Sequence, residues 1–274
     1  VYNIGGALNR NSSTRANQNG PEEYGFRGNA RNYDLNRDCI KSDTRNTKSF
    51  VEIFHLTNPD VFIDNHVSNG SDYQYKLTYI MTEPSKLGTV LGSYLKTEMM
   101  PSLVSDLKKK KIETTPYVNT FHETPDQGFA QFMDSPRYTT GYTSLFNSIG
   151  FVVETHMLKK YSDRVKVTYE FMKSTLEFTD SNAFTIKQKR KENEAQFQPN
   201  QSYTLQWEVD KSVQEPFTFL GYEAGYKKSD ATTGQRLYYD RTKPFKKEVP
   251  FFPQYKSVKD ITIPKAYFIP RGFW

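Results

Sequence analysis

The fold of this chain is decided by the stretch Pro59-Asp60-Val61-Phe62-Ile63-Asp64-Asn65-His66-Val67-Ser68-Asn69-Gly70. Its apolar first half predicts a short buried strand over residues 59–63. Asp64, Asn65 and His66 follow directly, and the Asn-Gly pair at residues 69–70 breaks the chain. Open α/β sheets bind their ligands beyond the carboxyl ends of the strands. The stretch therefore predicts a polar site at the edge of such a sheet, where His66 can offer a neutral imidazole to a metal.

Strands and helices alternate over the first 196 residues, which is the pattern of an α/β fold with helices flanking a mixed sheet. Beside the strand at 59–63, the sequence predicts strands over residues 75–81, 112–121 and 149–156. It predicts helices over residues 43–57, 85–109, 139–148 and 163–195. Residues 7–35 are rich in Asn, Arg and Gly and are expected to form a long loop.

The pattern changes at about residue 197, where short β-rich runs replace the helical periodicity. We therefore divide the chain into an α/β domain, residues 1–196, and a β-rich C-terminal module, residues 197–274. The module carries aromatic residues that suit a glycan-binding face, although such residues more often form a β core. These aromatic residues are Trp207, Tyr238, Tyr239 and Trp274.

Composition narrows the possible partners. The 274 residues carry a net charge of +6, but the basic residues are scattered except for the run Lys108–Lys111. That run lies at the end of a predicted helix and complements the helix dipole, so we expect no nucleic-acid partner. There is no run of about 20 apolar residues, so no membrane span is expected. The single cysteine, Cys39, excludes an internal disulfide.

Two further segments carry polar residues that suit a peptidase. Asn36-Arg37 places an amide beside a guanidinium, and an arginine fork recognises a carboxylate through two parallel hydrogen bonds. Phe151-Val152-Val153-Glu154-Thr155-His156 ends a predicted strand with a carboxylate, which is costly to bury unless it is solvated, paired or reactive. Glu154 is therefore either a general base or a carboxylate that orients a histidine, for which His156 is a candidate.

Taken in this order, the three segments resemble the zinc carboxypeptidases of the M14 (carboxypeptidase A-like) family, most closely a divergent, mostly bacterial branch. The resemblance covers roughly residues 1–180, and residues 197–274 resemble a β-rich extension of such proteins. It implies zinc-dependent removal of C-terminal residues from a peptide or peptidoglycan-type substrate that has a free carboxylate. It also implies a secreted or periplasmic location.

The resemblance implies a role for individual residues. His66 would be the third zinc ligand, and Glu154 would be the general base toward the attacking water. Asn36 and Arg37 would hold the terminal carboxylate of the substrate. Arg15 would polarise the scissile carbonyl.

Two of these roles have alternatives that the sequence leaves open. Arg27 and Arg31 lie in the same interval as Arg15. Tyr138 and Tyr142 are both candidates for the tyrosine that covers the substrate, and their spacing does not choose between them.

The chain departs from the family in its metal ligands. The family brings its first two zinc ligands in a His-x-x-Glu motif, and none of the four histidines here is followed by Glu three residues later. The chain also begins at Val1 without a methionine, in what reads as a strand over residues 1–6. We therefore expect an internal piece of a longer protein, inactive on its own. The alternative is a non-catalytic homologue that binds peptides or glycans.

Overall fold

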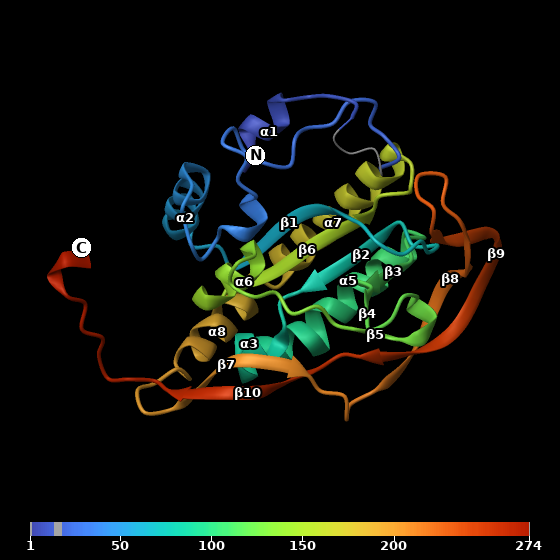
Figure 1. Ribbon diagram of the computed structural model, residues 1–274. Coiled ribbons are helices and arrows are strands. Elements are labelled where there is room, and N and C mark those ends of the chain that lie inside the picture. Colours follow the sequence, from blue (N-terminus) through green and yellow to red (C-terminus); the bar gives the residue numbers. More distant parts are fainter. Residues whose placement is uncertain (1, 14–17, 274) are drawn as a thin grey trace.

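The computed structural model describes residues 2–13 and 18–273 and shows a mixed α/β fold with a β-rich C-terminal part (Figure 1). The fold class predicted from the sequence is therefore confirmed. The strands of the α/β part are β1 (Val61–Ser68), β2 (Leu77–Met81), β3 (Thr114–Pro116), β4 (Asn119–Thr120), β5 (Phe129–Ala130) and β6 (Ile149–His156). The C-terminal strands are β7 (Ser202–Val209), β8 (Glu215–Lys228), β9 (Gln235–Phe252) and β10 (Tyr255–Thr262).

The longer helices are α2 (Arg45–Thr57), α5 (Met100–Lys109), α7 (Tyr161–Ser181) and α8 (Ala183–Glu194). The shorter α-helices are α1 (Ile4–Leu8), α3 (Pro84–Leu87), α4 (Thr89–Tyr94) and α6 (Thr139–Thr143). A π-helical turn, Leu95–Met99, joins α4 to α5, and 3-10 turns lie at Leu35–Arg37, Pro125–Gln127, Ser144–Phe146 and Arg271–Phe273. No helix of the described part is both long enough and apolar enough to cross a membrane.

The central sheet has the strand order β1-β6-β2-β3, in which β1 runs parallel to β6, β6 antiparallel to β2, and β2 parallel to β3. Strand β6 lies between two neighbours and is buried along almost its whole length, which explains its continuous apolar sequence. Helices α5 and α7 lie behind this sheet in Figure 1, and their apolar sides complete one core. Members of that core include Leu77, Leu103, Phe151, Val167 and Phe171.

Helix α2 begins and ends at residues suited to those positions. The hydroxyl of Thr44 accepts a hydrogen bond from the backbone N–H of Thr47 at 3.1 Å, which caps the first turn. Asn58 ends the helix in the left-handed conformation, with φ at 42°. The helix lies beside β1, where the rings of Phe50 and Phe62 are 5.7 Å apart.

Several predicted elements differ from the structure. Residues 4–8 form helix α1 rather than a strand, because the side chain of Asn3 caps the helix by accepting from the N–H of Gly6 at 2.9 Å. The predicted strand 112–121 is divided between β3 and β4, which belong to different sheets. The predicted helix 163–195 is divided into α7 and α8 at Asn182.

The C-terminal strands pack against the α/β part. Strand β9 pairs antiparallel with β8 and parallel with β5, in a sheet of order β4-β5-β9-β8. Strands β7 and β10 form a separate antiparallel ribbon. Aromatic residues from both parts share one core, made of Tyr73, Tyr75, Phe129, Phe219, Val249 and Phe251. The boundary at residue 197 stays a prediction. The shared core shows that residues on the two sides of it pack together.

Candidate functional site

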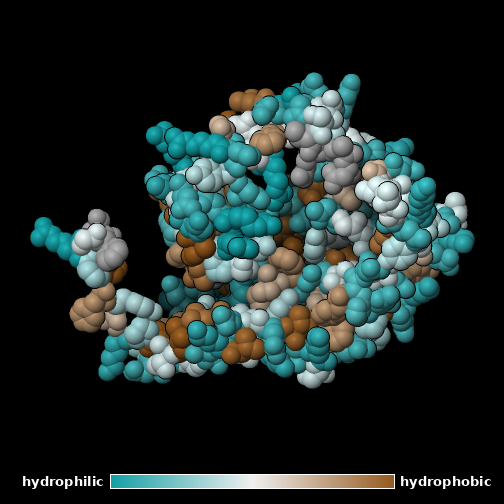
Figure 2. Space-filling model, in the orientation of Figure 1, coloured by the Kyte–Doolittle hydropathy of each residue, from teal (hydrophilic) through white to brown (hydrophobic). Residues whose placement is uncertain are grey.

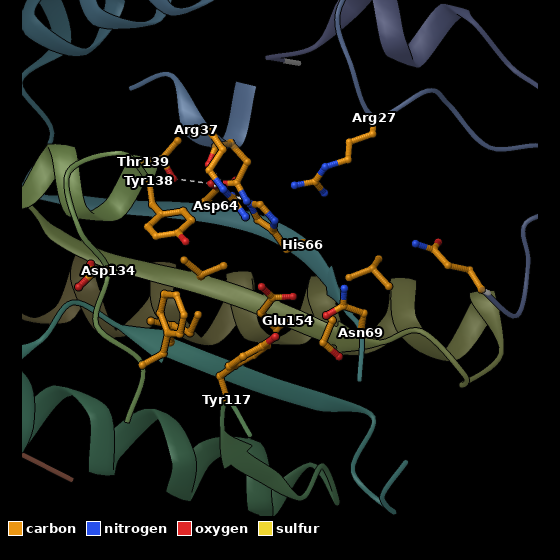
Figure 3. Close-up of a pocket in the computed structure, with 17 residues that line it drawn as sticks. Arg27, Arg37, Asp64, His66, Asn69, Tyr117, Asp134, Tyr138, Thr139 and Glu154 are labelled. Carbon is orange, nitrogen blue, oxygen red and sulfur yellow. Dashed lines mark hydrogen bonds and ion pairs between the residues drawn. The ribbon is translucent and has the colours of Figure 1, made fainter. Parts of the chain in front are cut away.

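A cavity of about 200 Å³ lies along β1 and β6, toward their carboxyl ends (Figure 3). We call it the cleft. The segment before α2 contributes Arg27, Asn36 and Arg37; β1 and the following turn contribute Asp64, His66 and Asn69; and β6 contributes Glu154. The opposite wall comes from residues 117–139 and includes Tyr117, Phe132, Asp134, Tyr138 and Thr139. In Figure 2 this face of the molecule is mostly hydrophilic and is hollowed between the N-terminal segment and the sheet.

Strand pairing brings His66 and Glu154 together. Strand β1 continues past Ile63 as far as Ser68, so His66 lies within the strand and pairs in register with Glu154 of β6. Neighbouring residues in register point to the same face of a sheet, and both side chains line the cleft. The sequence predicted that these two side chains converge, because each was placed at a strand end. In the structure they are neighbours in register and both line the cleft.

Asp64 holds the imidazole of His66. Its Oδ2 lies 2.9 Å from His66 Nε2 and also accepts a hydrogen bond from the hydroxyl of Thr139. Burial lowers the pKa of His66, but the hydrogen bond and charge of Asp64, with the charge of Glu154, raise it more, so the net pKa lies above the ordinary value. At any given pH, a larger fraction of this imidazole is therefore protonated than of a free histidine.

Glu154 has an unusual environment for a carboxylate. It is partly buried, and it interacts with Asp64, His66 and Arg27 through charge rather than through hydrogen bonds. Burial raises the pKa of Glu154 to about 7; the charge of Asp64 adds to this, while His66 and Arg27 oppose it. A carboxyl group with such a pKa exchanges protons near neutral pH, which suits a general acid or base.

The described residues do not fit a catalytic zinc ion on their own. Such a site uses three protein ligands, commonly two histidines and a glutamate in peptidases. No group of three His, Cys, Asp or Glu side chains in residues 2–13 and 18–273 is arranged to hold a metal. His66 supplies one imidazole, and the Nε2 of that ring faces Asp64.

Asn36 and Arg37 lie on the wall of the cleft formed by the N-terminal segment. They belong to a 3-10 turn capped by Asp34, whose Oδ1 accepts from the N–H of Asn36 at 3.0 Å. The guanidinium of Arg37 donates to the Asn36 carbonyl at 2.7 Å and lies 5.0 Å from the centre of the Tyr138 ring. Within the described residues Arg37 makes no ion pair, whereas Arg27 pairs with Asp34 at 2.9 Å.

The structure separates the two tyrosine candidates. Tyr138 lines the cleft, but Tyr142 does not. Tyr142 is buried against α2, and its hydroxyl lies 3.1 Å from Nε2 of His55. The expectation that Tyr142 contacts substrate is therefore corrected, because α6 turns this ring toward the helix rather than toward the cleft.

Arg15 lies outside the described residues. Of the other two arginines in that interval, Arg27 lines the cleft and Arg31 does not.

His156 lies outside the cleft and does not orient Glu154. It is fully buried, stacks on Tyr73, and its Nε2 lies 2.9 Å from Asp72 Oδ1. The other oxygen of Asp72 accepts from Nε of Arg241 at 2.6 Å, which ties β9 to the end of β6. Burial lowers the pKa of His156 despite the bond to Asp72.

The sequence reasoning assigned no role to several residues that line the cleft, chiefly Asp64, Thr139, Tyr117 and Asp134. A signal existed only for Asp64. It stands two residues before His66, which places both on one face of a strand if the strand extends past Ile63. The other three come from loops and short elements, whose position depends on tertiary packing.

Comparisons with known proteins give a distant structural similarity. No protein-family model matches the chain, and no curated protein matches it. Among solved structures, the chain is similar to a metallo-carboxypeptidase from Burkholderia cenocepacia, with a TM-score of 0.40 and 14% sequence identity. The alignment covers 56% of this chain and 40% of that one. The chain thus spans about two fifths of the length of the carboxypeptidase it matches.

Proposed function

We propose that this chain forms the substrate-binding part of a metallo-carboxypeptidase-type hydrolase. It would hold a peptide or peptidoglycan-type ligand by its C-terminal carboxylate, in a secreted or periplasmic setting. One observation carries the proposal. The cleft combines a guanidinium that has no acidic partner in the described residues, Arg37, with a carboxyl group of pKa about 7, Glu154.

Asn36 and Arg37 form the wall of the cleft that would bind the carboxylate of the ligand. A guanidinium offers five N–H donors in a planar fork, and a ligand carboxylate accepts two of them side by side. The ring of Tyr138 already supports the guanidinium, so little freedom is lost when a ligand arrives. The amide of Asn36 adds a further donor beside it.

Glu154 supplies the chemistry that this chain can perform. In its ionised form it accepts a proton from water, and in its protonated form it returns the proton to the leaving amine. Asp64 raises the pKa of His66, and the positive charge of a protonated His66 stabilises the ionised form of Glu154. Zinc-dependent hydrolysis would require further metal ligands, because no three His, Cys, Asp or Glu side chains in the described residues are arranged to hold a metal.

The misfit to zinc favours a second candidate function, a protein that binds the same ligands without cleaving them. The two functions share the carboxylate-binding wall and differ only in turnover. Both predict that a ligand with a free carboxylate binds more tightly than its amide.

The test is calorimetric titration with pairs of peptides that differ only in a free or amidated C-terminus. We expect the free acid to bind at least about tenfold more tightly, the lower end for a charge-assisted hydrogen bond. Equal affinities would overturn the proposal. Release of a C-terminal amino acid with added zinc, lost in Glu154→Gln, would establish the hydrolase.

A further inference from the structure

A second hollow, of about 700 Å³, lies between the hairpin of β8 and β9 and the turn that follows β1. We call it the hairpin hollow. It shares no lining residue with the cleft. The hairpin forms the end of the molecule opposite the C-terminal segment (Figure 1). The bridge between Tyr73 and Gly221 and the ion pair between Asp72 and Arg241 join it to the α/β part. The volume suits a small ligand, for which pockets measure roughly 300–1,000 Å³.

Two cations face each other at the hairpin hollow. Lys227 of β8 and Arg236 of β9 both line it and are direct partners in the antiparallel register, so their side chains lie on one face of the hairpin. Like charges placed directly opposite each other destabilise a sheet. Neither side chain forms an ion pair with any residue of the described part of the chain. We call these two residues the cation pair.

The same hairpin contains a like-charged pair that is neutralised. Glu223 and Asp240 are also direct partners in the register. The ammonium group of Lys243 lies 3.7 Å from the carboxylate of Glu223 and 4.0 Å from that of Asp240. The acidic pair therefore has a counter-charge from the protein, and the cation pair has none among the described residues.

The two acids that line the hairpin hollow already have other partners. Asp72 Oδ1 lies 2.9 Å from His156 Nε2, and its Oδ2 accepts from Nε of Arg241 at 2.6 Å. Glu123 accepts a hydrogen bond from the hydroxyl of Tyr226. The hollow is therefore left with positive charge that an anionic ligand would neutralise.

An aromatic ring stands beside the cation pair. Tyr238 follows Arg236 by two residues, which places both on the same face of β9, and the ammonium of Lys227 lies 5.6 Å from the centre of its ring. The ring packs over Gly225, its partner in the register, where an added Cβ would lie 3.1 Å from the ring. Glycine at position 225 thus leaves the space that the ring occupies.

The sequence suggested four aromatic residues for a glycan-binding face, and the structure separates them. Tyr238 and Tyr239 both line the hairpin hollow. Trp207 belongs to the separate ribbon of β7 and β10 and does not line it. Trp274 lies outside the described residues. A tyrosine ring offers a flat apolar surface with a polar hydroxyl at its edge, which suits a sugar ring with its hydroxyl groups.

We infer that the hairpin hollow binds an acidic saccharide, a sugar chain that carries carboxylate groups. The cation pair would bind these groups, with Arg236 donating two parallel hydrogen bonds to one carboxylate. The hydroxyls of Ser71 and Thr120, which also line the hollow, would pair with sugar hydroxyls. An acidic peptide would use the cations alone, whereas a saccharide uses the rings and hydroxyls as well. The inference does not depend on the proposed function, because the two sites share no residue.

The experiment is calorimetric titration of the full chain with trigalacturonic acid, its methyl ester and triglutamate. The ester keeps the sugar rings and removes their charge, and triglutamate keeps negative charge without the rings. We expect trigalacturonic acid to bind at least about tenfold more tightly than either of the others, which corresponds to one charge-assisted hydrogen bond. Lys227→Gln and Arg236→Gln should each lower its affinity by a similar factor.

The matched control is Lys228→Gln, which removes a charge from the same strand at a residue that does not line the hollow. It should leave the affinity unchanged. The three ligands on the unaltered chain decide the question even if a variant fails to fold. No binding of trigalacturonic acid, or equal binding of its ester, would overturn the inference. Equal binding of triglutamate would replace the saccharide by an acidic peptide, and equal losses in Lys227→Gln and Lys228→Gln would show that the hollow is not the site.

Discussion

Position 37 carries the most specific prediction at the scale of single residues. Replacing Arg37 by Lys keeps the charge but removes the planar fork that contacts both oxygens of a carboxylate. We expect Arg37→Lys to weaken binding of free-acid peptides by roughly 1.5–3 kcal/mol, the range for a hydrogen bond to a charged group. Calorimetric titration of Arg37→Lys measures this loss of affinity. Arg31→Lys, a change outside the cleft, is the control. Unchanged affinity would show that Arg37 is an ordinary surface residue.

His66 gives a prediction about metal. A tight zinc site needs three or four ligands. The described residues contain no group of three possible ligands, and the imidazole of His66 already faces Asp64. The purified chain should therefore retain no stoichiometric zinc after dialysis against a metal-free buffer. Elemental analysis checks this directly. One equivalent of zinc that survives dialysis would mean that ligands have been missed.

Glu83 predicts a pH dependence of stability. Burial raises its pKa to about 7 in the folded chain, against about 4.3 in the unfolded chain. Between these values the folded chain keeps a proton that the unfolded chain releases. The free energy of unfolding should therefore fall as the pH rises through this window, by at most about 4 kcal/mol.

Glu83→Gln should remove this fall, because a glutamine does not ionise. Urea unfolding of both proteins at pH 4.5, 6 and 8 should give curves that separate at the highest pH, with the variant the more stable. Groups of opposite slope, such as His156, cancel in the difference. Parallel pH profiles would show that Glu83 is not buried as an acid.

The residues of the site differ in how far the sequence could predict them. His66 and Glu154 were identified because each follows or ends a short apolar run, and Asn36 because it stands beside Arg37. All three line the cleft. Tyr138 and Tyr142 could not be separated. Tyr138 precedes α6 with an extended backbone, φ −92° and ψ 157°, while Tyr142 lies inside the helix and faces α2. That difference depends on where the helix begins, which spacing alone does not give.

At the scale of elements, apolar pattern predicted the strands of the central sheet and underestimated the length of β1. Residues 64–68 are mostly polar, so the strand predicted from the apolar pattern ended at Ile63. Their backbone nevertheless continues the parallel ladder as far as the pair Ser68 and His156. The break between α7 and α8 was also missed, because one polar residue, Asn182, interrupts a charged segment that is otherwise strongly helical.

Helix α8 depends on one buried amide. Asn193 is fully buried; its Oδ1 accepts from the N–H of Leu91 at 3.1 Å, and its Nδ2 donates to the Leu87 carbonyl. Asn193→Ala leaves both backbone groups buried without partners, so we expect a loss of about 2–4 kcal/mol in the free energy of unfolding. Gln188→Ala, on the exposed side of the same helix, should change it by less than about 0.5 kcal/mol. Similar losses in the two variants, measured by urea unfolding, would contradict this account.

At the scale of the whole molecule, the C-terminal strands were the hardest part to place. The two-residue strand β5 pairs with β9 across about 120 residues of sequence, through Phe129 with Phe251 and Ala130 with Phe252. So short a strand has no detectable pattern of its own. After residue 197 the described residues form strands β7 to β10 and no α-helix, as the β-rich pattern predicted. What pattern could not reveal is that this part shares its core with residues 73–130.

That shared core predicts how the chain responds to truncation. A chain ending at residue 196 would lose Phe219, Val249 and Phe251 and expose the rings of Tyr73 and Phe129, so it should unfold without cooperativity and bind a hydrophobic dye. A chain ending at residue 263, which keeps the backbone hydrogen bonds of Ile263 with Asn200 and Gln201, is the matched control. It loses only the segment after β10, which projects from the molecule in Figure 1 and whose Phe268 is 96% exposed. This control should unfold in urea like the full chain. A 196-residue fragment that is monomeric and unfolds cooperatively would instead establish residues 1–196 as an independent domain, because a domain must bury its own core.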